Sequence, residues 1–233
     1  MRIRSHRQET RRRTRTAKLG LAASALVIAL FATGCGGTAA PDESGQHSRV
    51  DTTVMRQIDH DYVPAESPEA LVKTDRHDVI AAGEVETILQ GDEIPMQAGD
   101  EQGEQFVLLK VRVTEAFRVR SANQITDGYA YVALWQGPRY NDPQGTPEFS
   151  LADWNRAIPA KTPVLLFLAA TDEGMRSGLH GVPANAIPLA ADVQGVIFED
   201  GGRLLGGLEE LEGQWTGIGS MKELTDRVRK QTK

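Results

Sequence analysis

The residues from Gln105 to Arg120 alternate between apolar and polar side chains with a period of two. This pattern is typical of a β-strand that packs one face on a core and turns the other face to solvent. Lys110 and Arg112 lie between the apolar positions, which are Val107, Leu109, Val111 and Val113. A strand with one solvated face predicts an antiparallel sheet, because strands of parallel sheets are usually apolar on both faces.

Three other segments have strand character. Val79–Leu89 is rich in β-forming residues and contains Gly83, where we expect a bulge or a bend. Tyr129–Trp135 alternates in the same way as the first strand. Pro163–Ala170, "PVLLFLAA", is apolar throughout and is expected to be a central strand that is buried on both faces.

Turn and cap signals punctuate the rest of this region. Asp200-Gly201 separates two short apolar runs and predicts a β-hairpin. Ser67 followed by Pro68 predicts the start of a short helix. Ser220 and Glu223 have the spacing of a capping box, and the helix that follows has an apolar stripe made of Met221, Leu224 and Val228.

This order of elements predicts a mainly β fold: a small antiparallel, OB-like β-barrel or curled sheet, with a short N-terminal helix and a C-terminal helix that close its ends. About 165 residues suffice for one such domain. The segments "DVIAAGEV", "VLLKVRVTEAF" and "TPVLLFLAA" give the body a faint resemblance to small β-barrel modules of uncharacterised extracytoplasmic bacterial proteins. That resemblance is one of pattern and carries no catalytic residues.

The first 35 residues differ from the rest of the chain. A head with eight cations and one acid is followed by 13 uncharged residues, Leu19–Phe31, and then by small residues that lead to Cys35, the only cysteine. A spanning helix needs about 20 apolar residues, so the run indicates a secretory signal peptide instead. The pair Arg11-Arg12 raises the twin-arginine export route, although the apolar residues which that route needs after the pair are absent.

The sequence "FATGC" at the end of this run resembles the lipobox of bacterial lipoprotein precursors, with Ala32 at the position where Leu is usual. The resemblance implies cleavage before Cys35 and a lipid on its sulfur, which would hold the protein at the extracytoplasmic face of the cell membrane. Two acyl chains anchor stably where one does not. The alternative is an ordinary secreted protein with a free thiol.

Three regions are therefore expected: a lipoprotein signal peptide over 1–34, a lipidated cysteine and flexible tether over 35–66, and a single β-rich domain over 67–233. The part from Val54 to Val63 is a candidate to pack on this domain. Removing residues 1–34 removes 8 basic and 1 acidic residue from the totals of 26 and 32, so the mature chain has a net charge of −13 rather than −6. An acidic body argues against nucleic acid as a partner.

The mature chain contains no catalytic or metal-binding motif that we can identify. Its four histidines, His47, His60, His77 and His180, lack a partner at ligand spacing and are interpreted as solvated loop residues. "GIGSM" and "GGRLLGG" match neither a nucleophile elbow nor a phosphate-binding loop. No metal and no cofactor is therefore expected.

Aromatic residues are the most suggestive feature. Tyr129, Tyr131 and Trp135 share one strand face, and a long loop over Gln136–Ala157 adds Tyr140 and Trp154. These five residues are the candidate ligand-binding residues, able to stack a sugar or a peptide. The alternative is that they cover the core.

The expected function is that of a non-enzymatic, lipid-anchored binding or interaction module at the cell envelope. Its partners would be the membrane, through the lipid on Cys35, and an unknown protein or small ligand. Two alternatives remain open at this point: an envelope hydrolase that uses carboxylates in an unrecognised arrangement, and a structural subunit of an envelope complex.

Overall fold

The computed structural model describes residues 49–94, 103–137, 145–171, 183–211 and 213–233. The described part contains six strands: β1 (Val79–Ile94), β2 (Glu104–Val119), β3 (Tyr129–Trp135), β4 (Pro163–Ala170), β5 (Pro188–Asp200) and β6 (Arg203–Gly206). It contains the α-helices α1 (Pro68–Lys73), α2 (Leu151–Ala157) and α3 (Met221–Gln231). The 3-10 turns are η1 (Thr52–Val54), η2 (Ala122–Gln124) and η4 (Gly213–Gly217).

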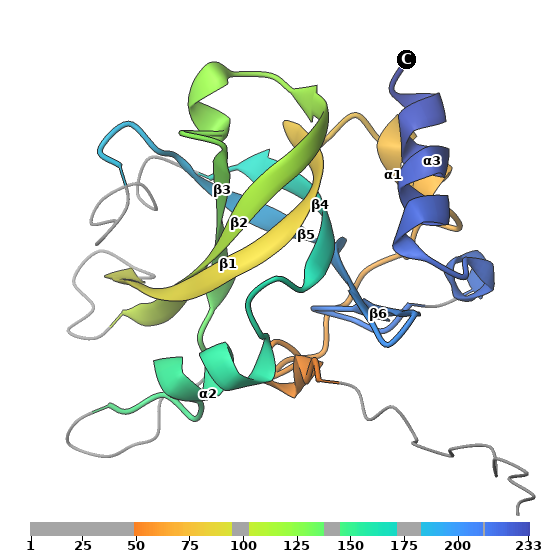
Figure 1. Cartoon of the computed structure of the whole chain (residues 1–233). Coiled ribbons are helices and arrows are strands. Elements are labelled where there is room, and N and C mark those ends of the chain that lie inside the picture. Colours follow the sequence, from red (N-terminus) through yellow and green to blue (C-terminus); the bar gives the residue numbers. More distant parts are fainter. Residues whose placement is uncertain (1–48, 95–102, 138–144, 172–182, 212) are drawn as a thin grey trace, which may run out of the picture. The chain divides into compact units, whose positions relative to one another are not determined.

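The strands form one sheet whose hydrogen bonds close into a ring (Figure 1). β1 pairs antiparallel with β2 and β4, β2 with β3, and β4 with β5. A parallel pairing of β3 with β5 joins the two ends, and β6 extends the sheet from β5. The expected mainly β fold, a curled antiparallel sheet with a short N-terminal helix and a C-terminal helix, is confirmed. We call the five strands that form this ring, β1 to β5, the ring sheet.

The long strands bend where their register shifts. The pairing of β1 with β2 shifts at several points, one of them between Ala82 and Gly83. A Cβ atom on Gly83 would lie 2.4 Å from the carbonyl oxygen of Arg112, so only glycine fits this close approach. The bulge expected at Gly83 is confirmed, and β1 continues beyond the predicted end at Leu89 to Ile94.

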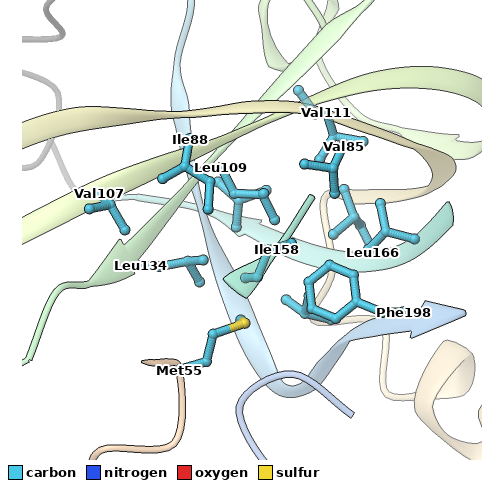
Figure 2. Close-up of a cluster of buried hydrophobic side chains, with 14 of the residues drawn as sticks. Met55, Val85, Ile88, Val107, Leu109, Val111, Leu134, Ile158, Leu166 and Phe198 are labelled. Atoms are coloured by element: carbon cyan, nitrogen blue, oxygen red, sulfur yellow. The ribbon is translucent and has the colours of Figure 1, made fainter. Parts of the chain in front are cut away.

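The inner face of the ring sheet holds the main core (Figure 2). The apolar positions of the first predicted strand point into it, as Val107, Leu109 and Val111 do in Figure 2. Side chains from all five strands meet there because residues two apart along a strand share a face. Helix α2 lies at one end of the ring and adds Trp154 to this core.

A second apolar cluster covers part of the outer face. Helices α1 and α3 lie side by side in Figure 1, and their buried residues Leu71 and Leu224 pack with Phe167 and Ile197 of β4 and β5. The prediction that these two helices close the ends of the sheet is therefore wrong: they lie against an outer face. β4 is buried on both sides, as expected, because its residues alternate between the two clusters.

Local signals at the turns behave mostly as expected. Gly201 and Gly202 both have positive φ, 59° and 74°, which is the conformation that a two-residue hairpin needs. Ser67 and Ser220 cap α1 and α3 through their hydroxyl groups. The capping box at Ser220 is only half formed, because Glu223 accepts a hydrogen bond from the N–H of Gly219 instead.

Residues 49–66, the described part of the expected tether, pack on the ring sheet. Val50, Val54 and Met55 are buried in the inner core. The backbone N–H of Val50 donates to Asp200 over 3.1 Å, and Arg56 donates to carbonyl groups at the end of β6. The packed body therefore begins at least 18 residues before the boundary predicted at Ser67. Of the Val54–Val63 part that was a candidate to pack, Val54 and Met55 are buried, whereas Ile58 and Val63 are exposed.

Candidate binding face

The predicted aromatic strand face lies on the outside of β3. Ala130, Val132 and Leu134 point into the inner core, so Tyr129 and Trp135, which have the opposite alternation, point away from it. The register with β2 places Phe106 opposite Trp135, and Arg112 opposite Tyr129. Phe106 was not predicted as a site residue, because its position beside Trp135 follows only from this register.

Two of the aromatic side chains are half-buried and have polar neighbours. The ammonium nitrogen of Lys110 lies 4.0 Å from the centre of the Tyr129 ring, within the range of a cation–π contact. The indole N–H of Trp135 donates to a carboxylate oxygen of Glu104. These contacts fix the rings while leaving part of each one exposed.

Tyr131 differs from its two neighbours on the strand. It is only 3% exposed, so it can offer a ligand little surface. Burial raises the pKa of its phenol above the usual value, and the charge of Asp127 adds to this effect. Tyr131 is thus a neutral, buried member of the stripe.

We use the name aromatic face for the partly exposed outer surface formed by Phe106, Lys110, Arg112, Tyr129 and Trp135. Arg112 is held by Glu84 on β1, with 2.6 Å between Nη2 and Oε2. The face therefore combines three rings and two cations on two adjacent strands. Such a surface can stack a planar or ring-shaped group and hydrogen bond to its polar edge.

Trp154 is not part of this face, so its prediction as a ligand-binding residue is wrong. It is fully buried in the inner core, because residues 151–157 form α2 instead of continuing a loop. Ser150 and Asp153 cap each other's backbone N–H groups at the start of α2, and that spacing is a signal that could have identified the helix. Tyr140 and Cys35 lie outside the described residues.

His77 also departs from its interpretation as a solvated loop residue. It is 1% exposed, and its Nε2 lies 3.0 Å from Oδ2 of Asp192 on β5. Burial opposes ionisation of Asp192, but the hydrogen bonds from His77 and from the N–H of Gln194, together with the charge of Arg76, outweigh it and lower the pKa of Asp192. The two partners are 115 residues apart, so no local pattern connects them.

Within the described ranges, no group of three or more His, Cys, Asp or Glu side chains lies close enough to hold a metal ion. None of the helices in the same ranges combines the length and the apolar character needed to cross a membrane. Comparisons with models of protein families, with curated proteins and with solved structures found no match for this chain.

Proposed function

We propose that this protein is a lipid-anchored, extracytoplasmic binding module and that the aromatic face takes its ligand. The observation that carries the proposal is the position of Trp135, a large apolar side chain that stays partly exposed on a strand, with its N–H already bonded. Phe106 lies opposite Trp135 and is also partly exposed, and the partly exposed Tyr129 lies at the other end of β3, beyond the buried Tyr131. Partly exposed aromatic residues in one stripe are typical of recognition surfaces.

The chemistry of the face fits an extended saccharide. Its rings lie along a strand rather than in a deep pocket, so they can stack the apolar face of a sugar, and Lys110 and Arg112 can bond to hydroxyl groups. The outer surface of the second and third strands is also where OB-type folds bind oligosaccharides and oligonucleotides. The net charge of −13 on the mature chain disfavours the second class.

A glycan array tests the proposed ligand class. The mature chain should bind a subset of immobilised oligosaccharides, and the double variant Tyr129→Ala, Trp135→Ala should lose most of that signal. Val119→Ala, which removes an exposed apolar side chain at the end of β2, is a matched control and should bind like the wild type. Absence of glycan binding by the wild type, or unchanged binding by the double variant, would refute the proposal.

The anchor is tested separately by cell fractionation. The proposed lipid on Cys35 is expected to place the wild type in the membrane fraction, because two acyl chains give stable attachment. A Cys35→Ala protein should leave that fraction while keeping its glycan binding. Retention of this variant in the membrane fraction would contradict the lipid anchor and leave the binding face untouched.

A further inference from the structure

A cavity of about 490 Å³ opens on another part of the outer surface, beside the paired strands β4 and β5. Its volume lies within the range of about 300–1,000 Å³ that is usual for small-molecule sites. Its floor is made of small side chains, since Ala169 pairs with Ala190 across the two strands. Val63, which is 91% exposed, stands on one wall, and the other apolar lining residues include Ala191 and Val193.

One end of this cavity is charged. Nη2 of Arg76 lies 2.6 Å from Oδ2 of Asp192, and the same oxygen lies 3.0 Å from Nε2 of His77. The side chain of Asp192 is only 9% exposed, whereas that of Arg76 is 56% exposed. The buried carboxylate of Asp192 therefore holds the exposed guanidinium group of Arg76 beside the cavity.

The ring of His77 also contacts this carboxylate. Its Nδ1 is buried and has no hydrogen-bond partner among the described residues. The Asp192 carboxylate thus lies between the buried ring of His77 and the exposed guanidinium group of Arg76.

The acidic residues near Arg76 in the sequence, Asp75 and Asp78, form ion pairs with other arginines. Asp75 is bound by Arg118 and Arg120, at 3.3 and 2.8 Å, and Asp78 lies 3.6 Å from Arg120. Within the described ranges, Asp192 is the only ion-pair partner of Arg76, and it uses one of five guanidinium donors. The remaining donors can bond to an incoming anion.

We infer that this cavity binds a small monocarboxylate with a short aliphatic chain. The carboxylate would take the exposed donors of Arg76, a pairing that guanidinium geometry favours. The chain would lie on the alanine floor and cover Val63, removing apolar surface from water. This site is separate from the aromatic face, and the inference does not depend on the proposed glycan binding.

Calorimetric titration with octanoate tests the inference. Octanoate should bind the wild type, and hexanoate should bind about 15-fold more weakly, because each buried methylene contributes about fourfold. Arg76→Gln should weaken octanoate binding by about 10–100-fold, the usual effect of losing a charged hydrogen bond. Octanol, which lacks the charge, should bind the wild type as weakly as octanoate binds this variant.

Three further variants locate the site. Ala190→Leu should weaken octanoate binding by filling the floor, while Arg203→Gln, at an exposed arginine of β6, should not change it. The double variant Tyr129→Ala, Trp135→Ala should also bind octanoate normally. Absence of saturable octanoate binding, equal affinity for octanol, or an effect of Arg76→Gln below twofold would overturn the inference.

Discussion

The outer face of the sheet has two parts, one covered by helices and one without such a cover in the described structure. Over β1, β4 and β5, helices α1 and α3 and turn η4 cover the strands with an apolar cluster. That cluster contains no residue of β3. Trp215 belongs to the covered part and is 1% exposed, whereas Trp135 belongs to the aromatic face and is half-buried.

Trp215 and Trp135 allow a direct comparison of the two parts, because the residue type is the same and only its surroundings differ. Both donate their indole N–H, Trp215 to the carbonyl of Ala65 over 2.8 Å and Trp135 to Glu104. Trp215 also meets the ring of Phe167 edge to face, with 6.4 Å between the ring centres. The same side chain is thus fully covered in one part and partly exposed in the other, and this contrast is the basis of the proposed binding face.

The largest effect is expected in the covered part. Trp215→Ala should lower the free energy of unfolding by about 3–5 kcal/mol, because a fully buried ring is lost from a packed cluster. Urea unfolding of the two proteins measures the difference. A loss below about 1 kcal/mol would show that the helices do not depend on this cluster for their attachment.

A smaller effect is expected on the aromatic face. Trp135→Ala should lower the free energy of unfolding by only about 1 kcal/mol, because the ring is only partly buried. The same urea experiment provides the value. A loss as large as that of Trp215→Ala would make Trp135 a core residue and remove the contrast between the two parts.

The smallest effect concerns the ion pair between the covering helices. Arg227 of α3 holds Glu69 of α1 in a bidentate contact of 2.6 and 2.9 Å. The hydrogen bond from Arg227 lowers the pKa of Glu69 below its usual value. Glu69→Gln should therefore cost about 0.5–1 kcal/mol at pH 7, the range of partly exposed ion pairs.

The pH dependence of that cost follows from the direction of the shift. The folded pKa of Glu69 is lower than the unfolded one, so its contribution is complete above about pH 5 and disappears as the pH falls through the folded value. The difference between the wild type and Glu69→Gln in urea unfolding should become smaller as the pH falls from 6 to 3. Glu66→Gln, at an exposed neighbour, is the control, and a constant difference across this pH range would contradict the assignment.

Much of the fold could be predicted because its signals are local. Short stretches of sequence determine several elements: the alternation in β2, the apolar run of β4 and the Asp200-Gly201 hairpin. The caps at Ser67 and Ser220 are equally local. Period and turn chemistry suffice for such elements, since the backbone geometry responds to neighbouring residues.

The candidate site was only partly predictable because its contacts are long-range. The exposed stripe with Tyr129 and Trp135 follows from alternation, but Phe106 joins it only through the register of β2 with β3. Trp154 was misplaced because Gln136–Ala157 was interpreted as one loop, whereas residues 151–157 form α2. His77 lies just before β1 and contacts Asp192 of β5, 115 residues later. The sequence spacing of these two residues gives no sign of that contact.

The most direct measurement of the central claim is the affinity of wild type and Trp135→Ala for the glycan that binds best on the array. Calorimetry should give at least tenfold weaker binding for the variant, because aromatic anchors dominate such contacts, while its free energy of unfolding falls by no more than about 1 kcal/mol. Equal affinities would contradict the account, because the exposed ring on β3 would then have no part in recognition.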